Sequence, residues 1–153
     1  MQLVEAKFRE QDDVCDSQFA KYGGLDAQPL HFNVRKKHCL DFETYSPAVS
    51  LMCGLSGLQS PLEKVRRIKE ACGRLSTIVS AVDGNPIGAD DLLPLFGYIA
   101  SCAQVPKFYS QVQFMELFTG EEANCGEAGY YLAMTQSCVS YIMEMDGQEK
   151  TTT

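Results

Sequence analysis

The sequence predicts an all-α fold of about six or seven helices packed around one central helix. Apolar residues recur at spacings of three and four along several segments, whereas the alternation typical of strands is weak throughout. The segment 91–104 carries no charged side chain after its first residue, which indicates a helix surrounded by other helices. With 153 residues, the chain is long enough to bury a single core.

Helical signals are softer in the first third of the chain. Apolar spacing up to Tyr22 indicates one or two helices that end ahead of Gly23 and Gly24, which are turn residues. Ser46 and Pro47 are expected to open the next helix, because proline fits a first turn, where its missing N–H has no helical partner anyway.

The clearest helix start lies at Ser60. A serine N-cap, Pro61 at the first helical position and Glu63 at the third form a capping box. Apolar residues then recur at helical spacing as far as Val79, which predicts an amphipathic surface helix. Its basic residues are expected away from the apolar face: Lys64, Arg66, Arg67 and Lys69.

The second half of the chain contains the central helix and two more helices. Turn residues crowd the segment 82–88, and the central helix follows over residues 91–104. A short helix is expected over 108–118, then a loop over 119–123 and a last helix that Asn124 could cap.

Charge and hydropathy exclude several classes of protein. The formal net charge is -7, and the only basic residues after residue 76 are Lys107 and Lys150. Nucleic acids and anionic membranes attract clustered Lys and Arg, so neither is an expected ligand. No apolar run reaches the roughly 20 residues that span a bilayer, and the N-terminus lacks the apolar core of a signal peptide. A cytoplasmic protein without direct membrane insertion is expected.

Cysteine and histidine patterns give no sign of a cofactor. The seven cysteines are odd in number, are never spaced C-x-x-C and lie mostly in apolar runs, which predicts reduced core thiols without disulfides or structural zinc. His31 and His38 are the only histidines, and surface or packing roles are expected for both. No glycine-rich nucleotide-binding motif occurs, so neither a metal nor another cofactor is expected.

An acidic pair, Asp90 and Asp91, stands at the mouth of the central helix. Either acid could simply be the N-cap, a role that contributes on the order of 1 kcal/mol, and spacing alone favours this interpretation. Two acids exceed what a cap needs, however, and Pro94 in the first turn has no N–H for the carbonyl of residue 90. A carboxylate held at the positive end of a helix stays ionised and can point outward.

Tyr130 and Tyr131 form a second pair, near the start of the last helix. Adjacent helical residues face different directions, so one ring is expected in the core and the other partly exposed. Periodicity leaves open which ring is which.

Three blocks of the sequence resemble the Vps-nine domain, the catalytic module of Rabex-type and RIN-type guanine-nucleotide exchange factors for early-endosomal Rab GTPases. The blocks are SPLEKVRRI over 60–68, GADDLLPL over 88–95 with Tyr98 and Ile99, and GEAGYYL over 126–132. Their order and intervals match the family, and the segment 106–115 resembles its short helix, so the likeness covers about residues 45–146.

The resemblance implies an exchange domain over residues 46–146, preceded by a partial N-terminal helical segment over 1–45. The polar end, residues 147–153, is expected to be a disordered tail. The implied function is guanine-nucleotide exchange on a Rab-family small GTPase of the early endosomal type, without covalent chemistry and with recruitment to early endosomes. In that family the first aspartate of the pair is a finger inserted into the nucleotide site of the GTPase, so Asp90 is the implied catalytic residue.

The resemblance also implies a GTPase-binding surface. Asp91, Pro94, Tyr130 and Ala133 match positions at or beside that surface, which selects Tyr130 as the exposed tyrosine. The family often has a threonine at the position of Ala133, so one hydroxyl contact is absent here. This departure, together with a short N-terminal segment, supports the alternative of a catalytically weak or inactive Rab-binding adaptor.

Overall fold

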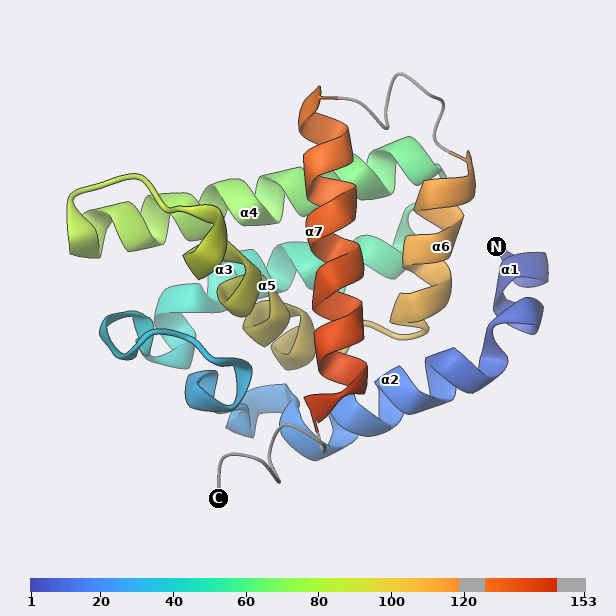
Figure 1. Cartoon of the computed structure of the whole chain (residues 1–153), viewed down its shortest axis with the longest axis horizontal. Coiled ribbons are helices and arrows are strands. Elements are labelled where there is room, and N and C mark those ends of the chain that lie inside the picture. The colour runs from blue at the N-terminus through green and yellow to red at the C-terminus, as the bar shows by residue number, and fades with distance from the viewer. Residues whose placement is uncertain (119–125, 146–153) are drawn as a thin grey trace.

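The computed structural model describes residues 1–118 and 126–145 and confirms the all-α fold (Figure 1). The described residues form α-helices and no strand: α1 (Gln2–Lys7), α2 (Arg9–Tyr22), α3 (Phe42–Cys53), α4 (Pro61–Asp83), α5 (Ala89–Ala103), α6 (Phe108–Phe118) and α7 (Gly126–Met143). Short 3-10 helices lie in the connections: η1 (Gly24–Asp26), η2 (Pro29–Phe32), η3 (Lys36–His38) and η4 (Leu55–Gly57). The predicted loop over 119–123, the Asn124 cap and the tail over 147–153 lie outside the described residues.

The uncharged helix is the central one, as predicted. Every residue of α5 from Leu95 to Cys102 is buried, and the helix contacts α2, α3, α4, α7, η1 and η2. It begins at Ala89, ahead of the predicted bound at residue 91. At its other end Gln104 adopts the left-handed conformation, and its side-chain amide donates to the carbonyl of Phe19 in α2 at 2.9 Å.

The N-terminal segment belongs to the same core. Helices α1 and α2 confirm the one or two helices expected before Gly23, and Figure 1 shows α2 running beneath α6 and the end of α7. Cys15 and Phe19 of α2 and Phe32 of η2 are fully or almost fully buried in the main cluster of apolar side chains. Residues 1–45 are therefore built into the fold and do not form a separate layer.

Helix α2 also caps the N-terminus of α6. The carboxylate of Asp12 accepts a hydrogen bond from the backbone N–H of Ser110 at 2.8 Å and another from its hydroxyl. Asp16 accepts from the backbone N–H of Lys107 at 3.3 Å. The orphan N–H groups at the start of a helix are usually satisfied by a local side chain, but here two acids from another helix do so.

Helix α3 begins earlier than the predicted start at Ser46. Its N-cap is Asp41, which accepts from the backbone N–H of Thr44 at 3.0 Å. Pro47 consequently lies inside the helix and has no N–H for the carbonyl of Glu43. The hydroxyl of Ser46 donates to that carbonyl instead, at 2.9 Å.

Helix α4 confirms one prediction and corrects another. The hydroxyl of Ser60 accepts from the N–H of Glu63 at 3.4 Å, as the capping box predicted. Lys64, however, is not on a solvated face: only 1% of the residue is exposed. Its ammonium donates to the carbonyl of Leu55 at 2.9 Å and to Oε1 of Gln111 at 2.8 Å. Burial lowers the pKa of Lys64, and the two acceptors explain why a lysine is tolerated there.

Candidate functional site

The turn between α4 and α5 brings the acidic pair to the surface. Gly84 ends α4 with a positive φ of 75°, a conformation that glycine adopts without strain. Gly88 is the N-cap of α5, and its carbonyl accepts from the N–H of Asp91 at 3.2 Å and of Leu92 at 2.9 Å. The N-cap interpretation of Asp90 or Asp91 was therefore wrong, since both acids lie inside the first helical turn.

The two acids have different surroundings. Nε of Arg35 lies 3.1 Å from Oδ1 of Asp91, whose side chain is only 20% exposed. Asp90 is exposed, and within residues 1–118 and 126–145 its carboxylate has no hydrogen-bond or ion-pair partner. A negatively charged side chain at this position interacts favourably with the positive end of the helix dipole. Asp90 is thus the acid of the pair that is available to a binding partner.

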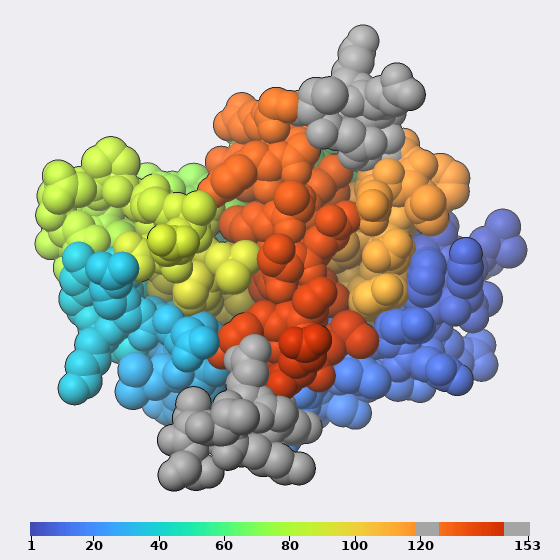
Figure 2. Space-filling view, in the orientation of Figure 1, coloured from blue at the N-terminus to red at the C-terminus, as the bar shows by residue number. Residues whose placement is uncertain are grey.

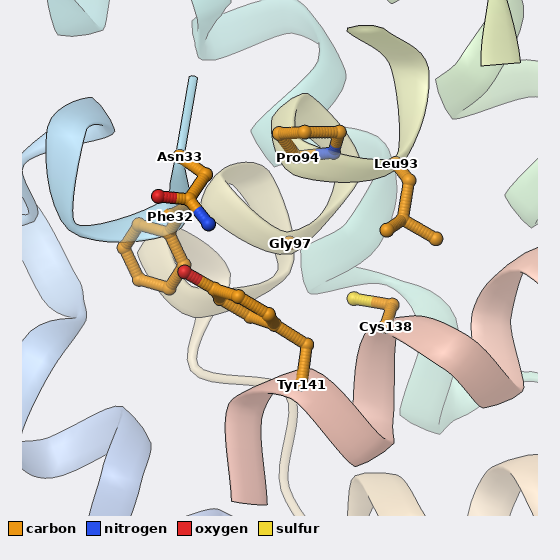
Figure 3. A pocket seen from close by; sticks show the side chains of 7 residues that line it. All are labelled: Phe32, Asn33, Leu93, Pro94, Gly97, Cys138 and Tyr141. Carbon is orange, nitrogen blue, oxygen red and sulfur yellow. The ribbon is translucent and has the colours of Figure 1, made fainter. Parts of the chain in front are cut away.

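Pro94 lies in the second turn of α5 and not in the first, because the helix begins at Ala89. The proline is partly buried and borders an apolar cavity of about 110 Å³ between α5 and α7 (Figure 3). The cavity is lined by residues of η2, α5 and α7 and by the residue after η2: Phe32, Asn33, Leu93, Pro94, Gly97, Cys138 and Tyr141. The proline ring therefore belongs to a largely apolar surface beside the acidic turn.

The structure shows which tyrosine of the pair is exposed. Tyr130 is 44% exposed, which confirms it as the exposed member. Tyr131 packs against the core but remains half-buried, so it is less enclosed than a core ring, and burial raises its pKa. The two rings meet edge to face, with centroids 5.2 Å apart. This geometry is favourable for aromatic pairs, so Tyr131 helps to hold the exposed ring in place.

Ala133 continues the exposed flank of α7. It is exposed and lies one turn after Tyr130, and two further turns along the same flank Tyr141 borders the cavity beside Pro94. At 1.5 Å per helical residue, the flank from Tyr130 to Tyr141 is about 16 Å long. An ion pair between Lys69 of α4 and Glu127, with 3.1 Å between Nζ and Oε2, holds the first turn of α7.

The predicted site residues thus lie on two helices that contact one another. Helix α5 carries Asp90, Asp91 and Pro94, and helix α7 carries Tyr130 and Ala133. Figure 2 shows α7 lying open on the surface, with the start of α5 beside it. We call the surface formed by these five residues the docking face. It presents one carboxylate that has no partner among the described residues, one exposed aromatic ring and apolar side chains.

Residues before position 45 support the docking face, and sequence reasoning missed them. His38 is buried, as one of its two predicted roles required, but it also contacts Asp83: Nε2 lies 2.8 Å from Oδ2. Lys37 approaches the other oxygen of Asp83 at 3.4 Å, and Arg35 pairs with Asp91. No local pattern could have revealed these pairs, because their members are far apart in the sequence.

The described residues contain no group of three or more histidine, cysteine, aspartate or glutamate side chains placed to hold a metal ion. Six cysteines lie in the described ranges, and all six are free thiols. Among the helices of residues 1–118 and 126–145, none is both long and apolar enough to cross a membrane.

The fold and the site define an all-α domain with an exposed acidic and aromatic face. The sequence model of the Vacuolar sorting protein 9 (VPS9) domain matches residues 45–147. The chain therefore belongs to the VPS9 domain family. A VPS9 domain is a guanine-nucleotide exchange domain, which is consistent with a regulator of a GTPase.

Three curated relatives illustrate the likeness. The Receptor-mediated endocytosis protein 6 homolog of Drosophila pseudoobscura pseudoobscura is 28% identical over 95 residues, which cover 62% of this chain and 5% of the relative. Ras and Rab interactor 2 of Mus musculus is 22% identical over 125 residues, which cover 76% of this chain and 14% of the relative. VPS9 domain-containing protein 1 of Homo sapiens is 39% identical over 56 residues, which cover 37% of this chain and 9% of the relative. The chain spans a small part of each of these relatives.

Proposed function

We propose that this chain is a guanine-nucleotide exchange factor for Rab-family small GTPases of the early endosomal type, with Asp90 as the catalytic residue. Family membership supports exchange, and the names of the relatives, which include Ras and Rab interactors and receptor-mediated endocytosis proteins, support Rab GTPases and endocytosis. The single observation that carries the role of Asp90 is its exposed carboxylate, which no group in residues 1–118 or 126–145 engages, beside an Asp91 that is held by Arg35.

The proposed mechanism is electrostatic. A GTPase holds GDP largely through Mg²⁺ and a lysine that binds the phosphates, so a carboxylate brought into this site competes for the lysine and disfavours the nucleotide. Two unit charges 4 Å apart attract by about 4 kcal/mol at an effective dielectric constant of ~20, which corresponds to roughly a thousandfold in nucleotide affinity. No covalent bond to the chain forms or breaks in this step.

The rest of the docking face would position the finger. The exposed ring of Tyr130 and the apolar surface around Pro94 are suited to the apolar parts of the GTPase switch regions. Asp91, paired with Arg35, would contact the GTPase from the edge of the face. Ala133 offers a methyl group and no hydroxyl, so it would contribute shape and no hydrogen bond.

Recruitment to early endosomes completes the proposal. The half of the chain that bears the docking face is strongly acidic, so an anionic lipid surface would repel it. We therefore propose that a protein partner, and not direct contact with lipid, recruits the chain to early endosomes.

Fluorescent GDP release from a panel of purified Rab GTPases tests the proposal. The parent chain is compared with Asp90→Asn, which keeps the size of the side chain and removes its charge. Glu10→Gln is the matched control, because Glu10 is an exposed acid at the second position of α2, just as Asp90 is in α5. We expect acceleration by the parent and by Glu10→Gln, and none by Asp90→Asn.

The outcomes separate the two candidate functions. Loss of one charge in a first helical turn should change the free energy of unfolding by only about 0.3–1 kcal/mol, so lost exchange cannot be attributed to unfolding. Normal exchange by Asp90→Asn would refute the finger assignment. Rab binding without acceleration by the parent would favour the inactive adaptor, for which the missing hydroxyl at Ala133 is the supporting observation.

A further inference from the structure

One short segment contacts the residues on both sides of the turn that precedes Asp90. Residues 35–38, Arg-Lys-Lys-His, which we call the basic segment, pair with Asp83 before the turn over residues 84–88 and with Asp91 after it. Figure 2 shows the cyan N-terminal chain touching the yellow-green turn between α4 and α5. The basic segment precedes residues 45–147, the part of the chain that matches the family.

The first contact is at Asp83, the last residue of α4. Its carboxylate pairs with Nε2 of His38 at 2.8 Å and with Nζ of Lys37 at 3.4 Å. The hydrogen bond from His38 is the main reason that the pKa of Asp83 lies below its ordinary value. An ionised carboxylate only accepts hydrogen bonds, so Nε2 of His38 is the donor. Asp83 is therefore held from two sides by adjacent residues.

His38 is itself immobilised, which makes the contact rigid. The residue is completely buried, and its backbone carbonyl accepts the hydroxyl of Tyr45 in α3 at 2.6 Å. Nδ1 is also buried and has no partner in the described part of the chain. A proton there would be a buried donor without an acceptor, so the contact with Asp83 is made by the N–H at Nε2.

The second contact is at Asp91, immediately after Asp90. Arg35 lies 3.1 Å from it and is 56% exposed, so this ion pair contributes little to global stability. Its effect is local. It links the first turn of α5 to the basic segment, and it balances one of two neighbouring negative charges, which would otherwise repel each other.

We infer that the basic segment positions the Asp90 carboxylate for nucleotide exchange, by holding Asp83 before the turn and Asp91 after it. The inference rests on the proposed function. When the Asp90 carboxylate is already held in position, it needs no further ordering after the GTPase binds. The effect of the basic segment is therefore expected in the maximal rate of nucleotide exchange and not in binding alone. Arg35, Lys37 and His38 are positioning residues, because they act through Asp83 and Asp91.

The first test uses steady-state exchange kinetics. GDP release is measured at increasing concentrations of the Arg35→Ala/Lys37→Ala chain, which gives a maximal rate and a half-saturating concentration. Misplacement of a reacting group by about 1 Å can cost ~100-fold, so we expect the maximal rate to fall by about 10- to 100-fold while half-saturation moves by less than about threefold. Arg35→Lys keeps a positive charge for Asp91, so it should retain most of the maximal rate that Arg35→Ala loses.

Lys36 offers a control in the same segment. It is exposed, and its side chain pairs with no acid in the described ranges, so Lys36→Ala removes one positive charge from the segment, where the double variant removes two, without touching either contact. We expect parental kinetics for Lys36→Ala. An equal loss in Lys36→Ala and in the double variant would overturn the inference, since a general effect of charge would then explain both.

A second readout does not depend on a GTPase. Amide hydrogen exchange over residues 84–92 of the free chain should be faster in Arg35→Ala/Lys37→Ala than in the parent, and unchanged in Lys36→Ala. If amide hydrogen exchange over these residues is unchanged in the double variant, the inference is overturned. If the parent chain fails to release GDP from any Rab, the proposed function fails, whereas faster amide exchange in the double variant would still show that the basic segment holds this turn.

Discussion

Replacement of Asp12 by alanine tests how far the fold depends on residues before position 45. Asp12 is 3% exposed and accepts both the backbone N–H and the hydroxyl of Ser110, the third residue of α6. Ser110 is completely buried, so no water can replace the lost acceptor without local opening. The variant therefore leaves two buried donors unsatisfied at the start of a helix.

The expected loss in the free energy of unfolding follows from these two hydrogen bonds. Hydrogen bonds to a charged group contribute about 1.5–3 kcal/mol each, and part of this is offset because the variant no longer buries a carboxylate. We expect Asp12→Ala to lower the free energy of unfolding by about 2–4 kcal/mol. Asp12→Asn should lose less, because its amide oxygen can still accept from the N–H of Ser110. Asp13→Ala is the control: this neighbouring residue is exposed, and its loss should cost less than about 0.5 kcal/mol.

Urea unfolding followed by circular dichroism measures these differences, with the slope of each transition compared to confirm two-state behaviour. For a chain of this size, about 3 kcal/mol corresponds to a fall in Tm of roughly 6–12 °C. An Asp12→Ala chain that unfolds within about 0.5 kcal/mol of Asp13→Ala would refute the reasoning, because α6 would then not need a cap from α2.

Two further predictions concern the docking face and the acid end of the pH range. Tyr130→Ala should weaken Rab binding with little change in Tm, whereas Tyr131→Ala should lower the free energy of unfolding by about 1–3 kcal/mol, since that ring is half-buried. Binding titrations and calorimetry measure the two effects. If the phenotypes are reversed, the two rings are misassigned. The pKa of Asp83 is lowered in the folded chain, mainly by His38, so its contribution to stability is present above about pH 4 and is lost as the pH falls through the lowered value. Urea unfolding at a series of pH values should show a shallower acid dependence in Asp83→Asn than in the parent and in Asp26→Asn, an exposed control; equal slopes in all three chains would count against the pairing with His38.

Local patterns in the sequence were sufficient for much of the fold. The Ser60 cap, the short helix over 108–118 and the central position of α5 all follow from interactions within a few residues or from the absence of charge along one helix. The motif around Asp90 and the Tyr130 pair could likewise be placed near the starts of α5 and α7, because each is a contiguous block on one helix.

Helix starts were less well determined where backbone groups decide them. The carbonyl of Gly88 receives the first hydrogen bonds of α5, so both acids fall inside the helix although aspartate is a common N-cap. At α3, the side chain of Asp41 and the hydroxyl of Ser46 together allow the helix to begin before Pro47 and to include it.

What the sequence by itself determined was the helices, their apolar faces and the blocks that carry the family likeness, because these depend on residues three or four positions apart. Only the tertiary structure decided that Asp91 is paired whereas Asp90 is exposed, that Lys64 is buried between two acceptors, and that Asp12 caps a distant helix. Each of these outcomes depends on which segments meet in space. A charged side chain takes its role from the partner that the fold brings to it, and no local pattern names that partner.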